Sequence, residues 1–111
     1  MLQYEIAKMV YEEIKGKVAN EASEDIKELY NDFLKDACDY ADNRKAWAFM
    51  DKSTQMKDDE SRSIKHDAYM SMLRAVCDNI NIKDIETIMP DRKSKGDFAC
   101  YIVLFLALEQ R

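Results

Sequence analysis

The sequence predicts an all-α fold, and three observations carry this prediction. Only two of the 111 residues are glycine and one is proline, whereas an all-β fold needs turn residues at short intervals. Apolar residues make up 47% of the chain and charged residues 35%, which is a globular composition. Apolar residues also recur at helical spacing along most of the chain. We therefore expect one domain over residues 1–111, a bundle of four to five helices with a long second helix.

The first helix is expected to end near Gly16 or Asn20. Its apolar residues at helical spacing are Leu2, Ile6, Met9, Val10 and Ile14. Ser23 then suits an N-cap, because acids that the helix dipole favours follow it directly. No glycine or proline interrupts residues 23–57, so the second helix should be long, with a kink near residues 42–43 or 53–54.

The third helix is expected to begin at the acid cluster 58–60 and to be central, because its apolar stripe is wide. A short helix should follow and end before Pro90, and residues 91–96 are expected to form a basic loop. Asp97 should cap the last helix, from Phe98 to about Glu109. Residues 98–108 are apolar on every side, which predicts a helix in the core or at a homo-oligomer interface.

Cysteine spacing and apolar run length argue against a disulfide-linked, metal-binding or membrane protein. Cys38, Cys77 and Cys100 have neither disulfide nor metal-ligand spacing, so we expect three reduced core cysteines and no metal site or cofactor. The start of the chain lacks a signal-peptide pattern, and the longest apolar run has 11 residues, whereas a membrane span needs about 20. We therefore expect a cytoplasmic protein that does not enter a membrane.

The charge distribution excludes generic nucleic-acid binding as an expected function. The net charge is −5, with 15 acids and 9 bases in residues 1–60 and 7 acids and 8 bases in residues 61–111. Generic binding to nucleic acid needs a basic surface. The first part of the chain is therefore a poor candidate for such binding, and a local basic patch in residues 61–111 stays open as an alternative.

A polar ladder on the third helix is the main candidate site. Asp59, Arg62 and His66 are three and four residues apart and so share one helix face. In one interpretation, Asp59 and Arg62 form a surface ion pair and His66 is a core-edge histidine. In the other, donors on this face and an arginine beside a tryptophan on the facing helix bind a phosphorylated ligand. The candidate ligand-binding residues are Arg44, Trp47, Asp59, Arg62, Lys65 and His66.

The second helix carries an acidic face. Its candidate partner-binding residues are Asp25, Glu28, Asp32, Asp36 and Asp39, flanked by Glu21 and Asp42. Residues 21–42 contain 8 acids and 2 bases. The face is either a solvated helix surface or a stripe that docks a host protein, for example by mimicking DNA.

We assign no catalytic residue, because the sequence contains no complete catalytic motif. A single histidine excludes schemes that need several, and no glycine-rich phosphate loop or Gly-x-Ser-x-Gly motif is present. The pair Arg62-x-x-x-His66 resembles the Arg-x4–6-His motif of HEPN-type ribonucleases, which are small helical bundles that often dimerise. The spacing here is one residue shorter than that range.

The stretch Asp-x-x-Arg-x-x-x-His-Asp-Ala, residues 59–68, resembles the central helix of a small domain family of unknown function. That family occurs in low-GC Gram-positive bacteria and their mobile elements. The matching positions are Asp59, Arg62, His66 and Asp67. The resemblance implies a helical bundle that can dimerise, and it implies no activity.

These observations favour a non-catalytic intracellular binding protein, encoded by a phage or mobile element. It would bind either a small phosphorylated ligand or a host protein, and a dimer is the expected oligomer. The alternatives are a metal-independent HEPN-like ribonuclease that uses Arg62 and His66, a structural oligomer, and an acidic DNA-mimicking inhibitor.

Overall fold

The fold is all-α, as predicted. A computed structural model describes residues 2–21 and 23–110, and these residues form five helices and no strand. The helices are α1 (Tyr4–Ala19), α2 (Glu24–Ala48), α3 (Lys52–Asn79), α4 (Ile85–Ile88) and α5 (Arg92–Glu109). The prediction of a long second helix is confirmed, since α2 has 25 residues.

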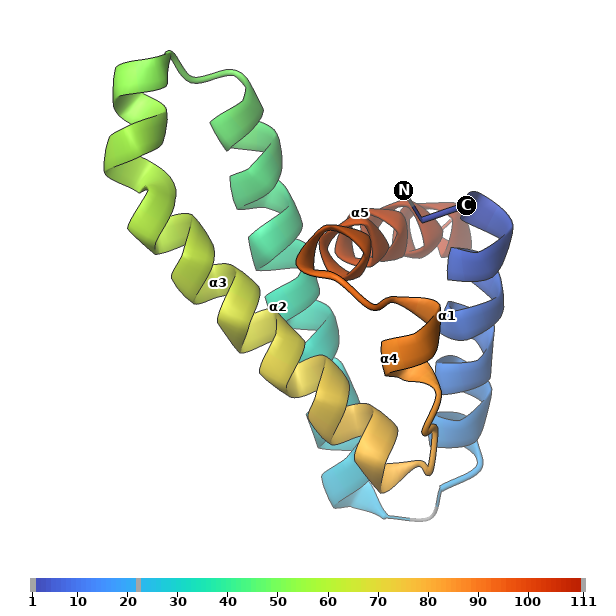
Figure 1. Cartoon of the computed structure of the whole chain (residues 1–111). Coiled ribbons are helices and arrows are strands. Elements are labelled where there is room, and N and C mark those ends of the chain that lie inside the picture. The colour runs from blue at the N-terminus through green and yellow to red at the C-terminus, as the bar shows by residue number, and fades with distance from the viewer. Residues whose placement is uncertain (1, 22, 111) are drawn as a thin grey trace.

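Helices α2 and α3 form a long antiparallel hairpin. Its closed end extends past the other helices (Figure 1), and the molecule is 47 Å long. Ser23 caps α2 as predicted, accepting a hydrogen bond from the amide of Ile26. The predicted helix to residue 57, with a kink, is wrong, because the chain reverses at residues 49–51 and Asp51 caps α3. Its Oδ1 accepts from the amide nitrogen of Thr54 at 2.8 Å.

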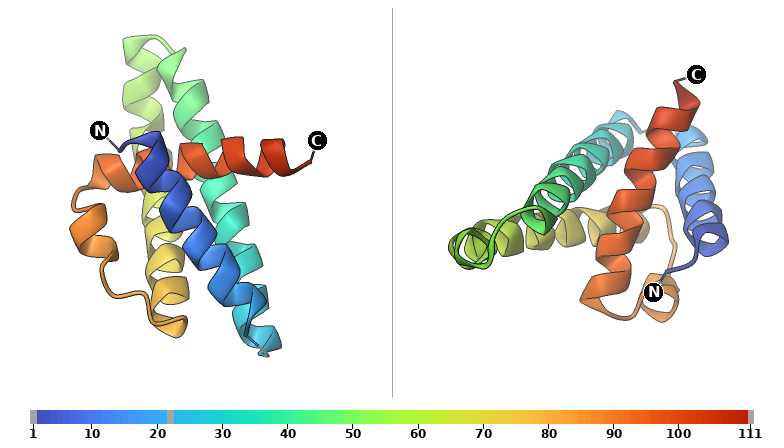
Figure 2. Two further views of the ribbon diagram at one scale, coloured as in Figure 1. Left: turned by 90° about the vertical axis from the view of Figure 1, so that its right-hand side faces the viewer. Right: turned by 90° about the horizontal axis from the view of Figure 1, so that it is seen from above.

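Helix α5 crosses the hairpin (Figure 2) and begins earlier than predicted. Asp91 and Ser94 form a capping box, in which the Ser94 amide donates to Asp91 Oδ1 at 2.7 Å. The predicted loop over residues 91–96 is therefore wrong, and Asp97 lies inside the helix instead of capping it. Gly96 is a helical residue that Tyr40 approaches closely.

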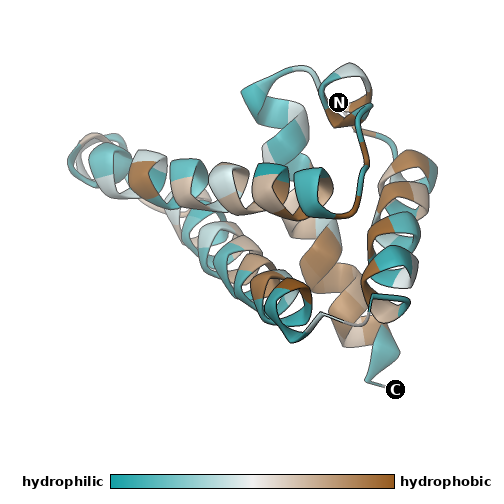
Figure 3. Ribbon diagram, turned by 90° about the horizontal axis from the view of Figure 1, so that it is seen from below, coloured by the Kyte–Doolittle hydropathy of each residue, from teal (hydrophilic) through white to brown (hydrophobic). Residues whose placement is uncertain are grey.

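The core centres on stacked aromatic rings. Tyr69 is fully buried, and its ring stacks on those of Tyr40 and Phe33 at centroid distances of 5.8 and 6.1 Å. Its hydroxyl donates a hydrogen bond of 2.6 Å to the backbone oxygen of Lys95. The hydrophobic segments gather where the helices face one another (Figure 3). This packing fixes the start of α5 against both helices of the hairpin.

One face of α5 is in the core and another is exposed. Ile102 is fully buried, whereas the exposed fractions of Leu104 and Leu108 are 43% and 42%. An interface that covers this exposed face stays a prediction. Cys77 is buried as expected, whereas Cys38 is half-buried and Cys100 is exposed, with its Sγ 3.9 Å from Arg44 Nη1 on α2. Across residues 2–21 and 23–110, no helix has both the length and the apolar character needed to span a bilayer.

Candidate functional site

A cavity of about 300 Å³ lies where α2, α3 and the start of α5 meet. Its lining residues are Tyr40, Arg44, Arg62, Ser63, His66, Arg92 and Lys93. Four of these seven are permanent cations and none is an acid, although the whole chain has a net charge of −5. Cations that converge on a partly enclosed space favour a bound anion.

Arg62 is held in place by contacts outside this cavity. Its Nη2 donates to Asp59 Oδ1 at 2.9 Å, and its guanidinium carbon lies 4.7 Å from the centre of the Trp47 ring. Trp47 is itself fixed by two hydrogen bonds with Gln55 on the facing helix. Within the described chain, the buried Nε of Arg62 has no hydrogen-bond partner. Arg62 is thus pre-oriented and retains a free donor.

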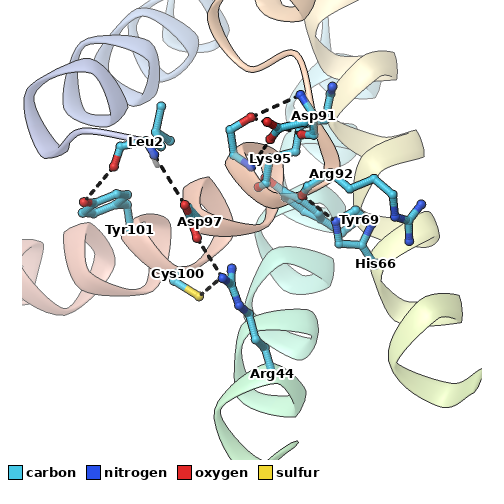
Figure 4. A network of polar contacts seen from close by, with 11 residues as sticks. Leu2, Arg44, His66, Tyr69, Asp91, Arg92, Lys95, Asp97, Cys100 and Tyr101 are labelled. Carbon is cyan, nitrogen blue, oxygen red and sulfur yellow. Dashed lines mark hydrogen bonds and ion pairs between the residues drawn. The ribbon is translucent and has the colours of Figure 1, made fainter. Parts of the chain in front are cut away.

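Arg44 is anchored to α5. Its Nη2 donates to Asp97 Oδ1 at 2.8 Å, and Asp97 Oδ2 accepts from the amide of Leu2 at 3.4 Å (Figure 4). A Cβ atom on Gly96 would lie 2.8 Å from the Tyr40 hydroxyl oxygen and 3.1 Å from Arg44 Nη1. The missing side chain of Gly96 therefore lets both groups approach the first turns of α5.

The remaining two cations come from the first turn of α5. Arg92 Nη1 donates to Asp67 Oδ1 on α3 at 3.0 Å. Lys93 forms no ion pair with any residue in the described part of the chain. Each of the three arginines is thus paired with a carboxylate that does not line the cavity, and Lys93 carries the unbalanced charge.

His66 lines the cavity with a buried ring. The residue is 3% exposed, and its Nε2 lies 3.1 Å from the carbonyl oxygen of Arg92. A carbonyl only accepts, so Nε2 carries the proton and a neutral ring leaves a lone pair on Nδ1. Nδ1 has no hydrogen-bond partner among the described residues. Burial lowers the pKa of His66, while the bond to the Arg92 carbonyl opposes this shift, so the ring is neutral at neutral pH.

Acid is expected to weaken the fold through His66. The unfolded ring takes up a proton near its ordinary pKa of about 6.5, whereas the folded ring stays neutral to lower pH. The free energy of unfolding should thus fall as the pH drops below about 6.5, by up to about 1.4 kcal/mol per pH unit, until the folded pKa is reached. Urea denaturation in bis-Tris chloride buffer measures this slope.

His66→Gln is the matched variant, because His66 is the single histidine of the chain. The variant should lose the part of the slope that lies just below pH 6.5 or so and keep the acid-range slope of the carboxylates. Equal slopes in the two proteins would contradict a depressed pKa at His66.

The structure brings together some of the predicted ligand-binding residues. Arg44, Arg62 and His66 line the same cavity. Trp47 and Asp59 contact Arg62 and line a neighbouring cavity of about 330 Å³. Lys65 is exposed and lines neither cavity. Sequence reasoning missed Tyr40, Ser63, Arg92 and Lys93 as lining residues. The basic stretch at residues 91–96 is the one sequence signal for Arg92 and Lys93, but the loop predicted there does not place them at this site.

The acidic face of α2 is mostly exposed. Asp25, Glu28, Asp32 and Asp39 are exposed, and Asp36 is half-buried. Burial raises the pKa of Asp36, and repulsion by Asp39 and Asp32 raises it further. Docking of a host protein on this face stays a prediction.

No group of three or more His, Cys, Asp and Glu side chains is arranged for a metal ion among residues 2–21 and 23–110. Comparisons of the chain with protein-family models, with curated proteins and with solved structures find no match. The resemblance of residues 59–68 to a small helical domain family therefore stays a prediction.

Proposed function

We propose that the protein binds a small phosphorylated molecule in the cation-lined cavity and does not transform it. One observation carries this proposal: four cations and no acid line a cavity between three helices of a chain with net charge −5. Two of its lining residues, Arg62 and His66, each have a buried polar atom, Nε and Nδ1, that lacks a hydrogen-bond partner within the described residues. Buried polar atoms normally find partners, so this pair is what a site that awaits a ligand would contain.

The cavity offers complementary chemistry to a phosphate ester. Phosphate oxygens accept strong charge-assisted hydrogen bonds from guanidinium and ammonium groups. The carboxylates that pair with the three arginines orient them before binding, which lowers the entropic cost of forming the complex. His66 adds a neutral ring to the wall, and its Nε2 proton is directed at the Arg92 carbonyl.

The site favours binding over the alternative of a HEPN-like ribonuclease. A histidine that exchanges protons with a polymer must reach it, yet His66 is 3% exposed and its Nε2 is bonded to a backbone carbonyl. Arg62 is held on Trp47 by a cation–π contact. Both residues are thus built into the wall of a small cavity, which suits a small ligand better than an RNA strand.

Titration calorimetry with inorganic phosphate, at pH about 7.5 and constant chloride, tests the proposal. Wild-type protein should bind phosphate, and Arg62→Ala should weaken binding at least ~10-fold, because one charge-assisted contact contributes roughly 1.5–3 kcal/mol. Arg74→Ala is the matched control. Arg74 is an exposed arginine on the same helix that pairs with Glu86, so its removal changes the net charge equally and should leave binding unchanged.

Two results would overturn the proposal. The first is no phosphate binding beyond that of chloride at equal ionic strength. The second is an equal loss in Arg62→Ala and Arg74→Ala, which would show general attraction to a charged surface and no defined site.

A further inference from the structure

A second and larger cavity of about 660 Å³ lies beside the cation-lined cavity, between the second half of α2 and α5. Its wall is largely apolar: Leu2, Ala41, Ala48, Tyr101 and Leu104 line it. Leu104 is 43% exposed, so the wall is accessible from solvent. An open apolar surface next to a charged pocket is the arrangement by which proteins hold small amphiphilic ligands.

Two residues belong to both cavities. Arg44 and Lys93 line the large apolar cavity and the small cation-lined one, so the two spaces adjoin across these side chains. Lys45 adds a third cation to the larger cavity. Its one acid, Asp97, is already bonded to Arg44 Nη2 and to the Leu2 amide (Figure 4). The cations therefore stand at the boundary between an apolar wall and an anion pocket.

We infer that the ligand is a phosphate monoester of an apolar group, with its phosphate in the cation-lined cavity and its apolar group against Leu104 and Ala48. This inference rests on the proposed function and specifies its ligand class. Charge complementarity places the phosphate, since the smaller cavity has four cations and no acid. The apolar wall then lies on the far side of Arg44 and Lys93, within reach of the group that the phosphate carries.

The test compares two phosphate monoesters of equal charge and similar size, phenyl phosphate and glycerol 1-phosphate, with inorganic phosphate as the reference. Wild-type protein should bind phenyl phosphate ~10-fold more tightly than glycerol 1-phosphate, because only the phenyl group loses apolar surface to the wall. Leu104→Asn should abolish this preference while leaving the affinity for inorganic phosphate unchanged.

Leu108→Asn is the matched control. Leu108 lies one turn further along α5, is 42% exposed against 43% for Leu104, and does not line the apolar cavity. This variant should keep the ~10-fold preference. Phenyl phosphate should also slow alkylation of the exposed Cys100 thiol, which lines the cavity, without slowing that of Cys38.

The outcomes separate this inference from the proposed function. If none of the three phosphates binds, the proposed function fails and the inference fails with it. If inorganic phosphate binds but the two monoesters bind equally, the result supports the phosphate site and contradicts the inference that the ligand carries an apolar group. A preference that Leu104→Asn and Leu108→Asn reduce alike would overturn the placement of the apolar group.

Discussion

Replacing Tyr69 with alanine is expected to lower the free energy of unfolding by about 4 kcal/mol. The ring is fully buried and stacks on Phe33 and Tyr40 from α2, so its removal leaves a cavity at the centre of the core. The edge of the His66 ring also faces it, at a centroid distance of 6.3 Å. Urea denaturation at pH about 7.5 measures the loss, and destabilisation on this scale is typical when a buried aromatic ring is removed.

Tyr69→Phe separates the ring from its hydroxyl. This variant keeps the stacked rings and loses only the 2.6 Å hydrogen bond to the Lys95 carbonyl, which should cost about 1 kcal/mol. If Tyr69→Ala cost no more than Tyr69→Phe, the stacking of rings would not be the main support of this part of the core.

Replacing Gly96 with alanine should destabilise the protein by about 1–2 kcal/mol and weaken phosphate binding. The added Cβ would lie 2.8 Å from the Tyr40 hydroxyl oxygen and 3.1 Å from Arg44 Nη1. Tyr40 is 3% exposed and stacked on Tyr69, so its ring has little room to move. The overpacking should exceed the gain of about 1 kcal/mol that alanine brings to a helix, and Arg44 would be displaced from the cavity.

Gly16→Ala is the matched control for this substitution. Gly16 is also a helical residue, in α1, but a Cβ there would meet nothing within 4 Å. Gly16→Ala should therefore stabilise the protein by up to about 1 kcal/mol. Opposite signs of the two stability changes in parallel denaturation experiments are the expected result. A gain at Gly96 equal to that at Gly16 would falsify the steric argument.

Local signals in the sequence predicted much of the fold. Spacing of apolar residues identified the helices, and Ser23 was recognised as the cap of α2. The turn at residues 49–51 was missed because it contains neither glycine nor proline, and only the side chain of Asp51 marks the start of α3. The start of α5 was missed for a different reason. The basic stretch 91–96 predicts a loop, whereas its Gly96 is helical and permits a close contact with Tyr40.

The candidate site could be predicted only where it depends on spacing within one helix. Arg62 and His66 lie four residues apart on α3, so their shared face followed from helical geometry. Arg92 and Lys93 join them because the chain reverses between α3 and α5 and packs the start of α5 on the hairpin. That packing is a tertiary property, and no local pattern encodes it. The same holds for Tyr40, which packs on Tyr69 of the facing helix and lines the cavity.

Helix α5, which follows all the other helices in the sequence, completes the interior. Ile102 and Phe105 of α5 are core residues, and the Tyr101 hydroxyl donates to the Leu2 carbonyl oxygen across almost the whole length of the sequence. A nascent chain that has reached only α4 therefore exposes the apolar surfaces of α1 and α2 that α5 covers in the folded protein. Apolar surface that stays exposed during folding favours aggregation. The cation-lined cavity, which needs Arg92 and Lys93 of α5, is thus completed together with the core.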